Sequence, residues 1–262
     1  MAISLKSKRE IAGLREAGRI VAETYEELRP RVKPGVSTGE LDRLAEEFIR
    51  RKGARPMYKG YGARPASNGR PATPPFPATI CVAINEVICH GIPSPKQVLQ
   101  EGDIIGVDIG VLYQGWVGDA CQTFAVGTIN AQSQSLIDVT ERCLALGIEQ
   151  ARPGKHMGDI GAAIQGYAES QGFSVVRELV GHGVGHNLWE DPQVPHYGSA
   201  GTGLKLQPGL VFTIEPMINI GKPAIRMLPD RWTIRTADGS RSAQFEHTLA
   251  ITEGAPELLT VL

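Results

Sequence analysis

The sequence predicts an α+β domain made of two related halves. Helices near 7–30 and 37–51 are followed by strand-rich sequence over 78–126, and this order returns in the second half, with helices near 133–151 and 158–171 before strand-rich sequence over 174–252. In addition, PGVSTGELDRLAEEFIRRKG (34–53) aligns without a gap with PGKHMGDIGAAIQGYAESQG (153–172), 119 positions later. Helices followed by strands, twice over, are typical of an α+β fold with an internal repeat. We therefore expect one domain, 1–262, with halves of approximately 1–130 and 131–262 and a site between them.

The first helix pair has clear start and stop signals. Apolar side chains recur at helical spacing along 7–30, and Pro30 and Pro34 mark the end of this helix. Ser37 and Glu40 then form a capping-box pattern that opens the second helix, which Gly53 closes.

The stretch IIGVDIGVLYQGWVGDACQTF (104–124) reads as a hairpin that turns at Gln114-Gly115 and carries Asp108 and Asp119 within apolar strands. In this register Asp108 faces Cys121, and Asp119 is its diagonal neighbour on the same face, with Cβ atoms about 7–8 Å apart or less. Two ionised carboxylates in an apolar sheet cost several kcal/mol each unless they are compensated. A shared proton, a nearby arginine or a metal ion would serve, and the hairpin alone leaves these alternatives open.

The second half adds more acids and a histidine. His182 lies among glycines in GHGVGH (181–186), whereas Glu215 in LVFTIEPMI (210–218) and Glu246 in SAQFEHTLAIT (242–252) interrupt apolar sequence. We therefore expect each half to bury two acids in its sheet. One shared proton can neutralise only a single pair of carboxylates, so it does not account for four carboxylates and one imidazole without an obvious basic partner. They suit two divalent ions bridged by carboxylates.

Composition narrows the class of protein. A formal net charge of −1 argues against a broad electrostatic grip on nucleic acid or anionic membranes. No apolar run approaches the roughly 18 residues of a membrane span, and MAISLKSKRE is too polar for a signal peptide. We expect a cytoplasmic monomer with no nucleic-acid specificity and no membrane partner. The proline- and glycine-rich residues 62–77 are expected to form a loop. The four cysteines of the chain show no CxxC spacing, and we expect them to be reduced and mostly buried: Cys81, Cys89, Cys121 and Cys143.

Five motifs carry a resemblance to a known family. GVDIGV, GDACQTF, GHGVGH, FTIEPM and SAQFEHT resemble, in order and spacing, the metal-ligand motifs of methionine aminopeptidases, and the similarity covers nearly the whole chain. Because the chain has no N-terminal extension and no long insertion between His182 and Glu215, it resembles the bacterial type I enzymes. The resemblance implies the pita-bread fold, in which two pseudo-symmetric halves contribute an antiparallel sheet flanked by helices. It also implies removal of the N-terminal methionine from nascent proteins whose second residue is small, by a water that two metals activate.

The resemblance further implies the roles of individual residues. Asp119 and Glu246 would bridge two divalent ions (Mn, Co, Fe or Zn), Glu215 would also serve as general base, and His90 would contact the substrate near the scissile amide. The implied partners are peptide and nascent-protein N-termini, with the ribosome as a further candidate. The metal ligands would be Asp108, Asp119, His182, Glu215 and Glu246, and the methionine pocket would be lined by Tyr58, Tyr61, Phe76, Leu188 and Trp232.

Trp189 departs from the family pattern, which places at this position a histidine that donates to the substrate carbonyl. An indole N–H can donate one hydrogen bond but cannot take up a proton.

Two other interpretations of the function compete with the aminopeptidase. One is a related dinuclear peptidase such as a proline dipeptidase, and the other is a non-catalytic binding protein on the same scaffold.

Overall fold

The computed structural model describes residues 3–66 and 72–262 and confirms the predicted α+β class. The predicted helices agree with the observed ones to within two residues at each end. The part of the predicted loop at 67–71 lies outside the described residues. The helices are α1 (Lys8–Leu28), the short 3₁₀ helix η1 (Arg29–Arg31), α2 (Thr38–Arg51), α3 (Ala131–Gln150) and α4 (Met157–Ser170).

Local capping explains where the first two helices begin. The Ser7 hydroxyl accepts from the backbone N–H of Glu10, whose carboxylate in turn accepts from the backbone N–H of Ser7. The hydroxyl of Ser37 accepts from the backbone N–H of Glu40 at 3.2 Å, as the sequence pattern predicts for α2.

The first half is organised around a long hairpin of β4 (Ile104–Tyr113) and β5 (Trp116–Ala125). Gln114 and Gly115 form its turn with φ angles of 49° and 84°, the left-handed conformations that a tight two-residue hairpin turn requires. The register pairs Asp108 with Cys121 and Gly110 with Asp119, which confirms the predicted diagonal arrangement of the two aspartates. The short strand β1 (Arg55–Pro56) and β2 (Ile80–Ile84) both pair with β4.

The remaining strands are shorter and belong to the second half, except for β3 (Val87–Cys89), which the first half contributes. A five-stranded sheet has the order β15-β14-β9-β7-β8, and three-stranded sheets have the orders β13-β10-β6 and β11-β12-β3. Their bounds are β3 (Val87–Cys89), β6 (Ser174–Val175), β7 (Gly181–Gly183), β8 (Glu190–Val194), β9 (Val211–Ile214), β10 (Met217–Asn219), β11 (Ile225–Met227), β12 (Ile234–Thr236), β13 (Ser242–Gln244), β14 (His247–Ala250) and β15 (Glu257–Leu258).

One prediction about these strands is wrong. Glu215 and Glu246 were expected inside strands, but Glu215 lies in the break between β9 and β10, and Glu246 lies just before β14. β9 and β10 belong to different sheets, as do β13 and β14, so the chain changes sheet at each acid. The apolar run through 210–218 hides the break between β9 and β10. Pro216 lies in this break, as expected for a residue that has no N–H to donate to a neighbouring strand.

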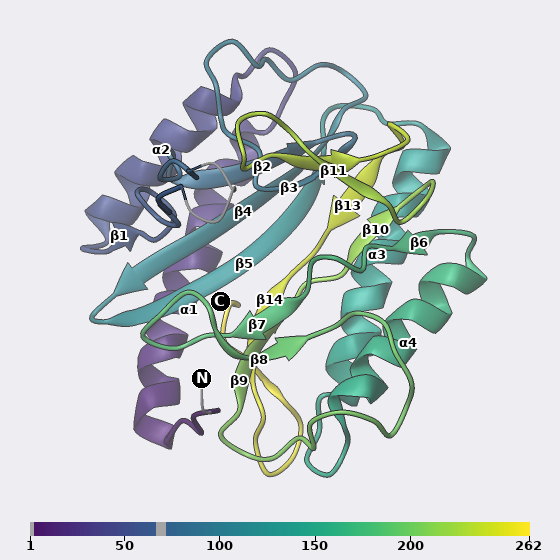
Figure 1. The fold of residues 1–262 in the computed structure, drawn as a ribbon. Coiled ribbons are helices and arrows are strands. Elements are labelled where there is room, and N and C mark those ends of the chain that lie inside the picture. The colour runs from purple at the N-terminus through teal and green to yellow at the C-terminus, as the bar shows by residue number, and fades with distance from the viewer. Residues whose placement is uncertain (1–2, 67–71) are drawn as a thin grey trace.

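The halves meet along β5 and the last strands (Figure 1). Helices α1 and α2 pack on the strands of the first half, at the left of Figure 1. Helices α3 and α4 pack on the strands of the second half, at the right. The backbone N–H of Glu246 donates to the Cys121 carbonyl at 2.8 Å, and the Thr248 hydroxyl donates to the Asp119 carbonyl at 2.7 Å. These bonds hold an acidic residue of the second half beside the acids of the first.

The internal repeat predicted from the sequence is present in the backbone. Helix α4 begins and ends 119 residues after α2. The loop glycines Gly35 and Gly154 have φ angles of 88° and 85°, and the closing glycines Gly53 and Gly172 have φ angles of 73° and 82°. The two glycines of each aligned pair therefore adopt the same left-handed backbone conformation, which is accessible mainly to glycine.

The largest apolar core clusters lie beneath the two helix pairs, one around Tyr25, Leu41 and Val107 and the other around Ile160, Phe212 and Leu249. All four cysteines are buried and unpaired, as predicted. None of the helices in the described ranges has the length and apolar character of a membrane span.

Candidate metal centre and active site

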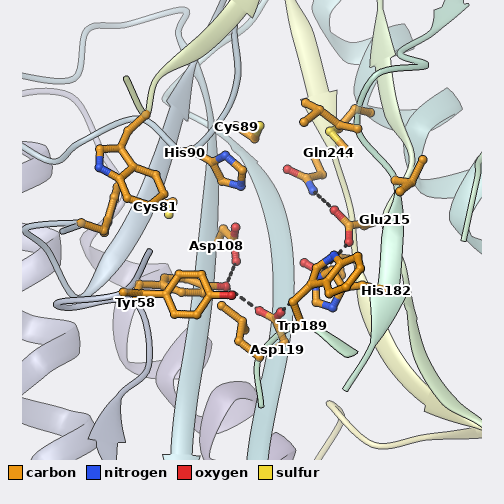
Figure 2. Close-up of a pocket in the computed structure, with 18 of the residues that line it drawn as sticks. Tyr58, Cys81, Cys89, His90, Asp108, Asp119, His182, Trp189, Glu215 and Gln244 are labelled. Atoms are coloured by element: carbon orange, nitrogen blue, oxygen red, sulfur yellow. Dashed lines mark hydrogen bonds and ion pairs between the residues drawn. The ribbon is translucent and has the colours of Figure 1, made fainter. Parts of the chain in front are cut away.

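The first half contributes Asp108 from β4 and Asp119 from β5. Both side chains are directed to one point, where the hydroxyl of Tyr58 contacts an oxygen of each carboxylate (Figure 2). Asp119 is 3 % exposed. The hairpin register produces this convergence, because diagonal side chains on one face of an antiparallel pair are neighbours.

The second half contributes His182 from β7 and Glu215 from the β9–β10 break. The Thr213 hydroxyl accepts from the backbone N–H of His182 at 3.0 Å and donates to Glu215 Oε1 at 2.8 Å, so it fixes both residues. His182 Nδ1 lies 3.1 Å from the carbonyl oxygen of Gly183. A carbonyl can only accept, so Nδ1 is the donor in this contact, and Nε2 faces the cluster, where its lone pair can bind a metal ion.

These groups form one cluster across the two halves. His182 Nε2 lies 3.7 Å from Asp119 Oδ2 and 3.6 Å from Glu215 Oε1. Asp119, His182 and Glu246 each offer a ligand atom within 4.8 Å of the others. Asp108 joins the cluster through Tyr58. All five predicted ligand positions are thus brought together, two from the first half and three from the second.

The electrostatics of the cluster call for a cation. Burial raises the pKa of Asp108, Glu215 and Glu246 well above the usual carboxyl range, and it raises the pKa of Asp119 as well. Mutual repulsion among the carboxylates adds to the rise for Asp108, Glu215 and Glu246. Among the residues that the structure describes, no lysine or arginine forms an ion pair with any of the four. Oxygen-rich donor sets with one imidazole suit divalent metal ions, so the residues present fit such an ion.

A cavity of about 650 Å³ opens onto the cluster. An apolar wall is built from aromatic rings that pack edge to face: Tyr58 against Phe76 with centroids 6.4 Å apart, and Phe76 against Trp232 at 5.3 Å. His90 packs against Trp232 with ring centroids 6.5 Å apart, and burial lowers the pKa of its imidazole to about 4. All the predicted substrate-contacting residues line this cavity: Tyr58, Tyr61, Phe76, His90, Leu188, Trp189 and Trp232.

Trp189 lies at this cavity with 37 % of its surface exposed. The loop before it is tied to the hairpin turn, because His186 stacks on Trp116 at 3.8 Å and its Nδ1 lies 2.7 Å from the Gly115 carbonyl. The next residue, Glu190, accepts from the Lys6 ammonium at 2.8 Å in a largely buried ion pair. The backbone of Trp189 is therefore anchored on both sides.

The sequence reasoning did not identify three residues that hold Glu215. Thr213 could have been found, since it lies two residues before Glu215 and alternate strand residues share a face. Gln244 donates to Glu215 Oε2 at 3.2 Å, and the fully buried His196 accepts from the Glu215 backbone N–H at 3.0 Å. Nothing in the local sequence around His196 signals this contact, which depends on the tertiary fold.

Comparisons with known proteins agree with this geometry. The model of "Metallopeptidase family M24" matches residues 12–253. The chain is 49% identical to methionine aminopeptidase 1 of Bacillus subtilis, covering 98% of this chain and 99% of the relative, and 44% identical to methionine aminopeptidase of Escherichia coli K12, covering 100% and 95%.

Solved structures give the same picture. Methionine aminopeptidase from Thermotoga maritima superposes with a TM-score of 0.93 at 40% identity, with 100% of both chains covered. A prolidase from Pyrococcus horikoshii superposes with a TM-score of 0.72 over 98% of this chain and 63% of the prolidase, but at 22% identity that likeness concerns the fold alone.

Proposed function

The chain belongs to metallopeptidase family M24, and we propose that it removes the N-terminal methionine from peptides and nascent proteins with the help of two divalent ions. The observation that carries this proposal is the convergence of four buried carboxylates and one imidazole beside an aromatic cavity, where no lysine or arginine of residues 3–66 and 72–262 pairs with the acids. The proline dipeptidase alternative has support only from distant fold similarity.

We propose Asp108, Asp119, His182, Glu215 and Glu246 as the ligands, with Asp119 and Glu246 shared between the ions. Asp119 and Glu246 suit this role because they lie where β5 and β14 join the two halves, and each has an oxygen within 4.8 Å of the other and of a His182 nitrogen. Divalent ions of the Mn, Co, Fe and Zn group all accept such ligands, and when bound they activate a water as nucleophile.

The protein's own residues would then orient the substrate and move protons. Glu215 is our proposed general base, because Thr213 and Gln244 hold its carboxylate at the cavity and burial raises its pKa above the usual carboxyl range, which strengthens it as a base. His90 stays neutral at physiological pH, so its imidazole can donate to or accept from the scissile amide.

The aromatic wall is our proposed site for the methionine side chain. An unbranched thioether packs favourably against aromatic rings, with the sulfur about 5 Å from the ring. Trp232 is held in place by a hydrogen bond from its indole N–H to the Pro74 carbonyl at 2.9 Å. We further propose that the enzyme requires a small second residue, that it acts in the cytoplasm as a monomer on chains emerging from the ribosome, and that 1–262 is a single catalytic domain.

The test is peptide hydrolysis by the full chain with added Mn²⁺ or Co²⁺. Free methionine should be released from Met-Ala-Ser, whereas Met-Lys and Xaa-Pro peptides should be poor substrates. Glu215→Gln should abolish turnover, because it removes the proposed base, and leave the circular dichroism spectrum unchanged. Glu178→Gln, at the same cavity but outside the cluster, is the control and should remain active. Comparable cleavage of Xaa-Pro peptides would favour the dipeptidase, and an active Glu215→Gln variant would remove Glu215 from its assigned role.

A further inference from the structure

The hydroxyl of Tyr58 has an unusual position for a residue of an apolar pocket wall. The side chain is only 7 % exposed, and its ring packs on Phe76, yet its hydroxyl contacts Asp108 Oδ1 and Asp119 Oδ1 (Figure 2). Hydrophobic packing would be served equally well by a phenylalanine, so the hydroxyl requires its own explanation.

The hairpin provides a slot for this ring. The backbone N–H of Met57 donates to the Gly110 carbonyl at 2.9 Å, which places Tyr58 directly over β4. Gly110 lies two residues after Asp108 and opposite Asp119 in the register. A Cβ atom at Gly110 would lie 2.6 Å from the Tyr58 ring, so the missing side chain leaves the space that lets the phenol reach the two acids.

The two oxygens of Asp119 face different neighbours. Oδ1 faces Tyr58, whereas Oδ2 lies 3.7 Å from His182 Nε2, on the side of Glu215 and Glu246. The second-half side of the cluster is therefore open to a cation without any movement of Tyr58. A cation held by Asp108 and Asp119, in contrast, needs carboxylate lone pairs that the hydroxyl already contacts.

We propose that the Tyr58 hydroxyl competes with a divalent cation for Asp108 and Asp119, so that it selectively weakens cation binding at that side of the centre. The competition is direct, because a hydroxyl proton and a cation both seek the carboxylate lone pairs. This inference rests on the metal centre of the proposed function. An alternative role for such a contact is to orient a ligand and thereby strengthen metal binding, which predicts the opposite effect.

The experiment measures Mn²⁺ binding to the metal-free full chain by isothermal titration calorimetry, with equilibrium dialysis to count the bound ions. Tyr58→Phe keeps the ring and removes only the hydroxyl. The dissociation constant of the more weakly bound ion should fall by about tenfold or more, the effect of losing one competing hydrogen bond to a carboxylate. The dissociation constant of the more tightly bound ion should stay the same.

Tyr25→Phe is the matched control. Tyr25 is also buried against the hairpin, but its hydroxyl donates to the carbonyls of Val107 and Ala120, each one residue away from an aspartate of the centre. Loss of that hydroxyl should lower the thermal unfolding midpoint without tightening either ion. Asp108→Asn should bind one ion fewer, and adding Tyr58→Phe to it should change nothing further.

Each other result overturns the inference. If two ions bind and Tyr58→Phe leaves the weaker one unchanged or weakens it, the hydroxyl is not a competitor, while the metal centre stands. If Tyr58→Phe tightens both ions alike, the selectivity is wrong. If neither the wild type nor any variant binds Mn²⁺, the metal centre itself fails and this inference fails with it.

Discussion

Trp189 is the residue whose chemistry fits the proposed reaction least well. It lies at the cavity with 37 % of its surface exposed, and its indole N–H can donate a hydrogen bond but cannot exchange a proton as an imidazole can. A donor aimed at an oxygen that gains charge in the transition state typically contributes about 10²–10³ in kcat. We predict that Trp189→His raises kcat on Met-Ala-Ser by about tenfold or more and changes KM less, as measured by steady-state kinetics.

Trp189→Phe separates the donor from the bulk of the ring. It removes the indole N–H but keeps an aromatic side chain, so it should not reproduce the gain of the histidine variant. If Trp189→His is no faster than the wild type, the indole already serves the reaction. A slower histidine variant with a changed preference for the second residue would instead assign Trp189 to substrate selection.

At the scale of residues, the acids and the histidine that come together in the cluster could be picked out from the sequence, whereas the contacts that support them could not. Asp108 and Asp119 stand out because acids are costly in apolar strands, and this cost is visible in a single sequence. The contact of Tyr58 with these acids was not predicted, because it depends on a ring from a distant segment entering the slot at Gly110. His196 was missed for the same reason, since its partner is a backbone N–H in another strand.

Helix α1 packs closely on β5, the strand that carries Asp119, and so fixes the position of this strand. A Cβ at Gly118 would lie 2.6 Å from backbone atoms of Ala17 and Gly18 in α1, and backbone cannot rotate away. Overpacking a well-packed core costs about 1–3 kcal/mol. We predict that Gly118→Ala lowers the free energy of unfolding by about that amount, measured by urea denaturation of the metal-free protein.

Gly166→Ala is the control for this prediction. Gly166 is an exposed position inside α4, and a Cβ there would meet no atom within 4 Å. Alanine favours a helix interior over glycine by about 0.8–1.0 kcal/mol, so this variant should be more stable than the wild type. Equal effects of the two substitutions would mean that the approach of α1 to β5 is not a tight contact.

At the scale of elements, the sequence predicted helices and the main hairpin better than the ends of the short strands. Helix caps and the Gln114-Gly115 turn have local signals that survive in isolation. The changes of sheet have weaker signals: at Glu215 it is Pro216 within an apolar run, and at Glu246 the sequence contains no proline or glycine that would mark a break. These breaks are nevertheless what direct the two glutamates into the centre.

At the scale of the whole molecule, the two halves meet at buried carboxylates, which are costly to bury when they are ionised. β5 of the first half and the last strands of the second half bring Asp119 and Glu246 together at the junction. The repeat and the five acid and histidine positions together predicted a site between halves, whereas the cavity walls required the folded chain. Since the junction concentrates like charge, its stability should depend on both metal and pH.

The last prediction concerns the stabilisation of the whole protein by metal as a function of pH. In the metal-free protein burial raises the pKa of Asp108, Asp119, Glu215 and Glu246, so the folded state holds protons that the unfolded chain releases at lower pH. Below about pH 4 these carboxyls are protonated in both states, and their contribution is fully present. As pH rises toward the raised pKa values, this contribution is lost, and unfolding becomes easier.

Buried histidines have the opposite dependence, but they do not obscure the test. Burial lowers the pKa of His196 to about 3 and of His90 and His247 to about 4, so their contribution is lost as pH falls below about 6.5. Because none of these three histidines is a proposed metal ligand, their contributions largely cancel when the two forms are compared at each pH. The difference therefore reports the proposed ligands, which are the four carboxylates together with His182.

We accordingly expect the thermal unfolding midpoint of the Mn²⁺-loaded protein to exceed that of the dialysed, metal-free protein by an amount that grows from pH 5 to pH 8. At an ion concentration about 100 times the dissociation constant, one bound ion stabilises by about 2.7 kcal/mol, which corresponds to roughly 5–10 °C for a chain of this size. Asp119→Asn should shrink the difference at every pH, because it removes a shared ligand. A difference that is constant, or that falls as pH rises, would show that the buried carboxylates are not what the metal neutralises.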